Sequence, residues 1–280
     1  MKKIVVSLLL TILFLGCSTT KRRIVRDIDI DLDASHYRNQ FTGFLLIDPI
    51  SNDTIYNRNS TKYFTPASNT KIFTLYASLK LIPESIPALR YIRENDTLFV
   101  QGTGDPSLLH PYLKDSTAIQ FLQKHDQVAL FLDNFTDDKY GPGWSWDDYH
   151  WYYSPERNSL PIYGNILTIK GGDSLDIIPE YFKDSIVFID HPLNRELEKN
   201  RFYYNSSRSD TLEIPFRIDS STTKILLAEI LDKKIHMTHT FAEGDYQILY
   251  GLSSDSVFKR MMLESDNFLA EQLLIVASSM

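Results

Sequence analysis

The sequence has 280 residues, of which 43% are hydrophobic and 12% aromatic, which excludes a disordered chain and is sufficient for a packed core. We expect one large domain or two smaller ones. A formal net charge of -7 argues against nucleic acid as a partner. Cys17 is the only cysteine, so no disulfide within the chain can stabilise the fold.

Residues 1–17 have the features of an export signal. Two lysines precede an apolar run, residues 4–15, that is too short to span a bilayer, and a glycine precedes Cys17. The segment resembles a lipoprotein signal, in which the cysteine is lipidated and becomes the new N-terminus. The alternative is an ordinary secretory signal with an incidental cysteine. The first interpretation predicts a protein anchored to the membrane through Cys17, in the cell envelope, facing the periplasm and attached to the outer membrane.

The next residues are expected to connect this signal to the first strands. Residues 18–26 are predicted to be a tether whose four basic side chains contact anionic lipid headgroups or stay in solvent. From residue 27 to residue 33, charged residues alternate with isoleucine and leucine, a pattern that suits an exposed edge strand or the end of the tether. Residues 41–48 and 54–57 are predicted to pair as a hairpin, because turn residues separate the two runs.

A helix is predicted from Pro66 to Leu81. Thr65 is a good N-cap, and Pro66 suits the first helical position. After Lys71 the segment is apolar almost all the way round, which is the pattern of a helix buried inside a domain. Ser68 and Lys71 are three positions apart, so they would share a face of this helix with their Cβ atoms about 5–6 Å apart.

This serine and lysine could together form a nucleophile and its base. A lysine among apolar neighbours loses the hydration of its charged form, so its pKa falls and it can take a proton from an adjacent hydroxyl. The free N–H groups at the helix N-terminus can stabilise an oxyanion. The same spacing occurs at Ser18/Lys21, Ser221/Lys224 and Ser256/Lys259. Only the copy at Ser68 lies at the head of a capped apolar helix, so it is the candidate site.

Beyond residue 83, short β-type runs separated by turns predominate. Strands are predicted at 96–101, 127–134, 165–170, 185–189, 211–218, 237–241 and 246–252, and helices at 118–124, at 222–233, from 254 and at 268–276. The turn at 102–106 is not a phosphate loop, because Pro106 has no N–H to donate. His236 and His239 point to opposite faces of an extended segment, which argues against a metal site.

Two further stretches place aromatic or polar groups in turns. The turn at 141–148 contains two tryptophans, which could stack on a sugar or could fix the loop to the domain. Ser265-Asp266-Asn267 is the only Ser-x-Asn sequence, and it falls in a short break between two apolar helices. A serine and an asparagine two positions apart on a bend can face one cleft, where they offer a hydroxyl for proton relay and an amide for orientation.

These motifs together resemble the penicillin-binding D-Ala-D-Ala carboxypeptidase/endopeptidase family (low-molecular-mass, class C), within the serine β-lactamase-like superfamily. The shared sequences, in the family's order, are Pro66-Ala67-Ser68-Asn69-Thr70-Lys71, Gly102-Thr103-Gly104-Asp105-Pro106, Gly143-Trp144-Ser145-Trp146-Asp147-Asp148 and Ser265-Asp266-Asn267 with Ala270-Glu271. The resemblance implies a serine peptidase that acts on peptidoglycan peptides ending in D-Ala-D-Ala and is covalently inhibited by β-lactams, with no metal or cofactor. It leaves open whether the preferred activity is carboxypeptidase or endopeptidase.

The resemblance also implies a role for each site residue. Ser68 would attack the carbonyl of the penultimate D-Ala, its backbone N–H would supply half of the oxyanion hole, and Lys71 would be the general base. Ser265 would pass a proton to the leaving D-Ala. Asn267 would hold Lys71 and the substrate amide in register. Asp133, at the end of a strand, would match a family position that senses the free amine of the peptide stem.

The expected fold is mixed α/β (α+β), with a β-lactamase/transpeptidase-like domain made of residues 27–90 and 216–280. A β-rich insertion, residues 91–215, would lie between these pieces. The family's third motif, a Lys-Thr-Gly strand that binds the substrate carboxylate, does not occur in the sequence. We therefore expect a fragment or truncated product that lacks the C-terminal part of the domain and is poorly active or unstable alone. The competing hypothesis is a lipid-anchored relative that binds cell-wall peptides without cleaving them.

Overall fold

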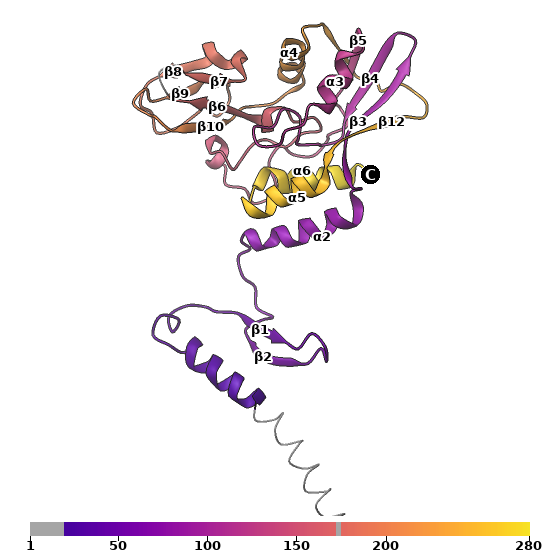
Figure 1. Ribbon diagram of the computed structural model, residues 1–280. Coiled ribbons are helices and arrows are strands. Elements are labelled where there is room, and N and C mark those ends of the chain that lie inside the picture. The colour runs from indigo at the N-terminus through magenta and orange to yellow at the C-terminus, as the bar shows by residue number, and fades with distance from the viewer. Residues whose placement is uncertain (1–19, 172–174) are drawn as a thin grey trace, which may run out of the picture. The chain divides into compact units, whose positions relative to one another are not determined.

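The computed structural model describes residues 20–171 and 175–280 (Figure 1). The chain falls into two compact units, Met1–Pro66 and Ala67–Met280. The predicted signal at residues 1–17, with the lipid attachment predicted at Cys17, lies outside the described residues. Among the helices in the described ranges, none has both the length and the apolar character needed to cross a bilayer.

Residues 20–32 of the first unit are helical. Of the two interpretations of residues 27–33, the exposed edge strand is therefore wrong. Val25, Ile28 and Leu32 are partly buried, and their spacing of three and four positions is the period of a helix. The alternation of aspartate with aliphatic residues in this stretch concealed that period.

Strands β1 (Phe44–Ile47) and β2 (Thr54–Arg58) pair as the predicted antiparallel hairpin. The hydroxyl of Tyr56, on β2, donates to the carboxylate of Asp29 (2.6 Å). This hydrogen bond attaches the first helix to the hairpin, so the two elements form one unit.

The second unit contains a five-stranded mixed sheet with the strand order β11-β5-β4-β3-β12. Its strands are β3 (Ser85–Glu94), β4 (Thr97–Gly102), β5 (Gln127–Phe131), β11 (Ile235–Thr238) and β12 (Gln247–Ser253). Strand β3 is antiparallel to β4 and β12, whereas β4, β5 and β11 are parallel. The helices α3 (Thr117–Gln123) and α4 (Ser220–Leu231) provide the crossover connections that parallel strands require.

Strand β3 is absent from the predicted elements, because proline normally excludes a central strand and Pro87 lies inside β3. Pro87 pairs with Tyr250 of β12 at a point where the register of the two strands shifts. The irregularity explains how this strand accommodates a proline. The expected boundary at residue 90 falls within β3, and β3 hydrogen-bonds to strands from both of the segments that follow that boundary. The proposed division into two pieces and an insertion stays a prediction.

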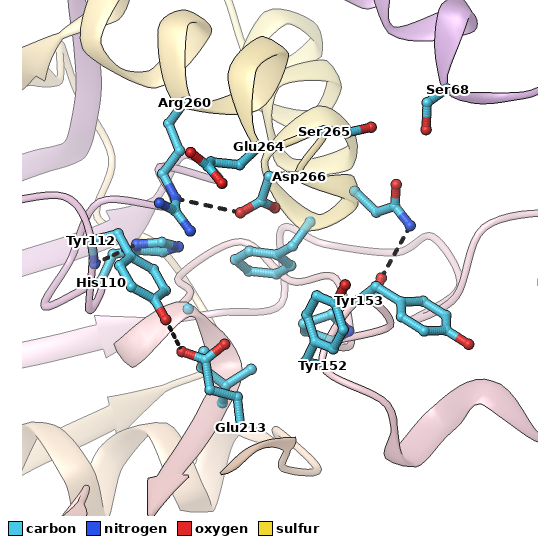
Figure 2. A pocket seen from close by; sticks show the side chains of 15 residues that line it. Ser68, His110, Tyr112, Tyr152, Tyr153, Glu213, Arg260, Glu264, Ser265 and Asp266 are labelled. Carbon is cyan, nitrogen blue, oxygen red and sulfur yellow. Dashed lines mark hydrogen bonds and ion pairs between the residues drawn. The ribbon is translucent and has the colours of Figure 1, made fainter. Parts of the chain in front are cut away.

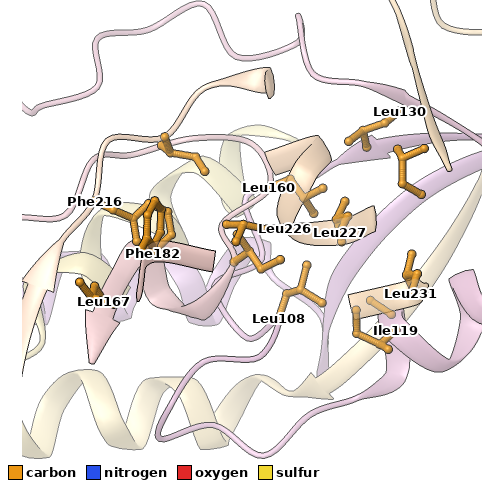
Figure 3. Packing of buried hydrophobic residues seen from close by; sticks show 14 of the residues in the cluster. Leu108, Ile119, Leu130, Leu160, Leu167, Phe182, Phe216, Leu226, Leu227 and Leu231 are labelled. Atoms are coloured by element: carbon orange, nitrogen blue, oxygen red, sulfur yellow. The ribbon is translucent and has the colours of Figure 1, made fainter. Parts of the chain in front are cut away.

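A second sheet has the order β10-β6-β7. It consists of β6 (Ile166–Lys170), β7 (Asp176–Ile178) and β10 (Thr211–Pro215), while β8 (Ile186–Phe188) and β9 (Phe202–Tyr204) form a separate parallel pair. Short 3-10 helices lie at η2 (Asp148–His150), η3 (Tyr163–Asn165) and η4 (Glu180–Ser185). Side chains from both sheets and from α3 and α4 share one hydrophobic core, part of which Figure 3 shows around Leu160 and Leu226.

A layer of helices with a hydrophobic core of its own carries the candidate site (Figure 1). The elements are η1 (Ser68–Thr70), α2 (Lys71–Leu81), α5 (Ser254–Leu263) and α6 (Asn267–Ser278). Leu269, Leu273 and Val276 of α6 are fully buried, and Val257 and Met261 of α5 pack in the same cluster. Their spacing of three and four positions places them on one face of each helix.

Helix α2 is at the predicted place, but it is not the fully buried helix that its composition predicts. Helical structure begins at Ser68 rather than at Pro66. Only Lys71 and Ser78 are buried, whereas Phe73 is 75% exposed and Tyr76 is 64% exposed. The helix packs on α5 and α6, and only the face turned toward them excludes water.

The turn at residues 102–106 packs against α6. Gly104 has a φ of +93°, and a Cβ atom at this position would lie 2.6 Å from Cγ2 of Ile275, so only glycine fits. The side-chain amide of Gln272 donates to the carbonyl of Gly104 (2.8 Å). The turn therefore fixes the position of α6, which carries Asn267.

Asp105, in the same turn, is buried and shares a serine with a second aspartate. The Oγ atom of Ser107 lies 2.9 Å from Oδ2 of Asp105 and 3.2 Å from Oδ2 of Asp115. Burial raises the pKa of Asp105 to about 7; hydrogen bonds from Ser107 oppose the shift, and the charge of Asp115 adds to it. One hydroxyl can donate to only one acceptor, so Ser107 cannot donate to both carboxylates. If Asp105 is protonated, it donates a hydrogen bond to the Ser107 hydroxyl, which in turn donates to Asp115.

Replacing Asp105 by asparagine is expected to remove part of the pH dependence of stability. The folded-state pKa of about 7 lies above the ordinary value of 3.8, so this contribution is fully present below the ordinary pKa and is lost as the pH rises through the folded pKa. From about pH 4 to pH 7, the free energy of unfolding should fall by up to about 1.4 kcal/mol per pH unit from this group. Urea unfolding measures the slope, which should be shallower in Asp105→Asn and unchanged in the exposed control Asp126→Asn. Equal slopes in all three proteins would contradict this expectation.

Candidate active site

Ser68, Lys71, Ser265 and Asn267 meet at the N-terminal end of α2. The Nζ atom of Lys71 lies 3.2 Å from Oγ of Ser68, 3.4 Å from Oγ of Ser265 and 2.5 Å from Oδ1 of Asn267. Ser265 and Asn267 are 194 and 196 positions away from the lysine in the sequence. The structure thus brings together the four residues predicted to be catalytic, while their roles stay predictions.

The bend between α5 and α6 gives Ser265 and Asn267 their positions. Ser265 has a φ of +54°, and Asp266 caps α6 by accepting a hydrogen bond from a backbone N–H in its first turn (3.0 Å). Asn267 is therefore the first residue of the helix. Its Oδ1 atom faces Lys71, and its Nδ2 atom donates to the carbonyl of Tyr153 (3.4 Å). These two contacts fix the orientation of the amide.

The environment of Lys71 shifts its protonation equilibrium toward the neutral amine. Lys71 is only 7% exposed, and burial lowers the pKa of its ammonium group, although the carboxylates of Asp266 and Glu271 oppose this shift. A lowered pKa increases the fraction of amine that can accept a proton near neutral pH. The hydroxyl of Ser68 is within hydrogen-bonding distance of this amine, so the pair has the geometry of a nucleophile and its base.

A cavity of about 790 Å³ adjoins Ser68, Ser265 and Asn267. Figure 2 shows Ser68 on one side of it and Arg260 on the other, with Ser265 and Asp266 between them and Tyr152 and Tyr153 below in this view. The volume is in the range that binds small organic ligands and peptide segments. The serine hydroxyl is thus accessible to a substrate that occupies the cavity.

The end of the cavity away from Ser68 is charged. The polar and charged side chains that line this end are those of His110, Tyr112, Glu213, Arg260, Glu264 and Asp266. Burial lowers the pKa of His110 to about 3, and the charge of Arg260 adds to the effect, so the imidazole is neutral at pH 7. Burial and the hydrogen bond to Glu213 raise the pKa of Tyr112 to about 12. Three carboxylates and one guanidinium group therefore set the charge of this end.

The aromatic turn at residues 141–148 lies partly against the body of the unit. Trp144 packs near Tyr140, with ring centroids 5.9 Å apart. Tyr149, the next residue after the turn, is buried, and its hydroxyl donates to the carbonyl of Arg195 (3.0 Å). Trp146 is 78% exposed. Trp144 and Tyr149 therefore fix the turn, as one of the two interpretations predicts, while Trp146 faces solvent.

Asp133 is not among the residues that line this cavity, and its predicted role stays a prediction. It follows β5, and its Oδ2 atom lies 2.9 Å from Nδ1 of His239. The charged residues that do line the cavity, such as Glu213 and Arg260, belong to no motif in the sequence, so only the fold reveals them. Among the residues that the structure describes, no group of three or more histidine, cysteine, aspartate or glutamate side chains could hold a metal ion.

Comparisons with known proteins identify relatives of this chain. Residues 26–172 match a family described as the D-Ala-D-Ala carboxypeptidase 3 (S13) family. A D-alanyl-D-alanine carboxypeptidase from Actinomadura sp. (strain R39) is 26% identical over 163 residues, which cover 52% of this chain and 29% of the relative. A crystal structure of penicillin binding protein 4 (dacB) from Haemophilus influenzae superimposes with a TM-score of 0.59 and 18% identity, over 84% of this chain and 62% of that chain. The chain thus spans less than two thirds of either protein, and the shared fold confirms the predicted mixed α/β class.

Proposed function

Because the chain belongs to the D-Ala-D-Ala carboxypeptidase 3 (S13) family, as its motifs predict, we propose that it is a serine peptidase that cleaves peptidoglycan stem peptides ending in D-Ala-D-Ala. We also propose that β-lactams acylate the same serine. The similarity to a D-alanyl-D-alanine carboxypeptidase supports the proposal. The observation on which it rests is the convergence of Ser68, Ser265 and Asn267 on Nζ of Lys71.

Acylation begins with the neutral amine of Lys71 as general base. The amine takes the hydroxyl proton of Ser68 while Oγ forms a bond to the carbonyl carbon of the penultimate D-Ala, whose oxygen becomes an oxyanion. The backbone N–H of Ser68 donates one hydrogen bond to this oxyanion. The burial of Lys71 supports this step, because burial favours the neutral amine.

Collapse of the tetrahedral intermediate breaks the C–N bond to the terminal D-Ala. The leaving nitrogen needs a proton, and the hydroxyl of Ser265 relays one to it from the ammonium group of Lys71 (3.4 Å between Nζ and Oγ). The products of this step are an ester on Ser68 and free D-Ala. Water then attacks the ester carbon and gives a proton to the amine of Lys71. The C–O bond to Oγ of Ser68 breaks, Lys71 returns the proton to Oγ, and the shortened peptide leaves with a free carboxylate. Asn267 holds the lysine in place during both steps.

Covalent labelling by a fluorescent penicillin tests this function. The full chain should gain one penicillin adduct, detected in a gel and by intact mass, and Ser68→Ala should gain none because the acylated oxygen is gone. The matched control is Ser256→Ala, which removes an exposed serine from another Ser-x-x-Lys sequence and should leave the labelling unchanged. An adduct that persists in Ser68→Ala would contradict the assignment of the nucleophile. A well-folded chain that gains no adduct would favour the non-catalytic peptide-binding alternative.

A further inference from the structure

A second, smaller cavity of about 220 Å³ is lined by Lys71 but not by Ser68 or Ser265. Thr70, Asn267 and a tryptophan contribute to its wall. Among its lining residues, only Lys71 and Glu271 have acidic or basic side chains. The cavity therefore places one carboxylate in the surroundings of the lysine, on a side that the large cavity does not reach.

The position of Glu271 on α6 follows from that of Asn267. The two residues are four positions apart, so they lie one turn apart on the same face of the helix. Asn267 contacts the lysine directly, with 2.5 Å between Oδ1 and Nζ. Glu271 therefore faces the same cavity as the lysine, one helical turn farther along.

Arg157 holds the carboxylate of Glu271. Its Nη1 atom lies 3.2 Å from Oε2 of Glu271, and its Nη2 atom lies 3.0 Å from Oδ2 of Asp137. The side chain of Arg157 is 8% exposed and that of Glu271 is 27% exposed, whereas that of Asp137 is 66% exposed. The pair with Glu271 is therefore the better shielded of the two from water, and its charges act more strongly on their surroundings.

The other charged groups around Lys71 have partners of their own. Asp266 on α6 contacts Arg260 on α5 (3.6 Å) and caps its own helix. Tyr153, whose backbone carbonyl accepts a hydrogen bond from the side-chain amide of Asn267, donates a hydrogen bond from its hydroxyl to Asp148 (3.0 Å). Burial lowers the pKa of Lys71, and the charges of Asp266 and Glu271 raise it. Glu271 differs from Asp266 because it lies outside the bend and can be altered without loss of the helix cap.

We propose that Glu271, held by Arg157, is a positioning residue that sets the charge state of Lys71 from the small cavity. The carboxylate stabilises the ammonium form of the lysine, and Arg157 offsets much of this effect by neutralising the carboxylate. The ion pair thus limits the electrostatic effect of Glu271 on Lys71, so that the lysine does not become a permanent cation. The electrostatic effect of Glu271 and Arg157 on Lys71 depends only on where their charges lie. Its consequence for catalysis rests on the proposed function.

Direct titration of Lys71 tests the proposal without requiring activity. The Cε resonance of the lysine can be followed by NMR in full-length protein labelled with [6-13C]lysine, and Lys71→Arg assigns it. Glu271→Gln removes the negative charge with little change of shape, so the midpoint should move to lower pH, by about half a unit. Arg157→Met removes the offsetting positive charge, so the midpoint should move to higher pH by a similar amount. Arg157→Lys keeps the charge and should restore a midpoint close to that of the unmodified protein.

Opposite shifts distinguish electrostatic control from a structural role, because loosened packing would move both midpoints in the same direction. Asp137→Asn is the matched control: it removes the other, exposed carboxylate of Arg157 and should leave the midpoint unchanged. A midpoint that stays in place in Glu271→Gln, or that moves to higher pH, would overturn the proposal. In the penicillin assay, the acid limb of the labelling rate should move in the same directions. Absence of labelling in the unmodified chain would count against the proposed function and leave the titration result intact.

Discussion

Replacing Lys71 by methionine is expected to reduce the rate of acylation of Ser68 by penicillin by about 10²–10⁴-fold, the usual contribution of a general base. Methionine has a similar length and no charge, so it fills the buried site without a new desolvation cost. The loss should be in the rate of covalent bond formation, because Ser68 itself is intact. Stopped-flow or quenched labelling over a range of penicillin concentrations measures this rate constant.

The matched control for Lys71→Met is Lys80→Met. Lys80 lies near the other end of α2, is exposed, and has its Nζ atom 5.7 Å from the centre of the Tyr76 ring. Its replacement removes the same charge from the same helix but should change the acylation rate by less than about twofold, because solvent screens an exposed charge near the far end of the helix. Comparable rates in the two variants would remove Lys71 from the role of base.

Replacing Arg195 by methionine should lower the free energy of unfolding by about 3 kcal/mol or more. Arg195 is fully buried, and its guanidinium group donates to the backbone carbonyls of Tyr149, Glu196, Leu197, Lys199 and Pro215. The guanidinium group also lies 5.0 Å from the centre of the Tyr149 ring. Methionine cannot donate to these carbonyls, and each buried acceptor that remains unsatisfied costs about 1–3 kcal/mol. Urea unfolding followed by circular dichroism measures the loss.

Arg201→Met is the control for the stability measurement. Arg201 is 56% exposed at its side chain and pairs with Glu196 at 3.6 Å, so its replacement should cost no more than about 0.5–1 kcal/mol. A loss in Arg195→Met as small as that in Arg201→Met would show that water satisfies the five carbonyls. Because Tyr149 follows directly on the aromatic turn, the Arg195 variant should also loosen that turn, which near-ultraviolet circular dichroism of the tryptophans would detect.

The elements with strong local signals could be predicted from the sequence. Helix α4 begins after Asp219, whose side chain accepts from the N–H of Thr222, and this cap is visible in the sequence as an aspartate before serines and threonines. The break between α5 and α6 is predicted because the polar residues 265–267 separate two apolar helical runs. Strand β3 could not be predicted in this way. Its proline is tolerated only because β3 pairs irregularly with β12, which lies more than 150 positions away in the sequence.

The sequence by itself determined that Ser68 and Lys71 form a pair, because a helix places residues three positions apart on one face whatever surrounds it. The tertiary structure alone decided that Asn267 meets this lysine, that Arg157 holds Glu271, and that Asp133 pairs with His239. The members of each of these pairs are more than 100 positions apart. Their contacts depend on how whole helices and strands pack, and local spacing carries no information about that packing.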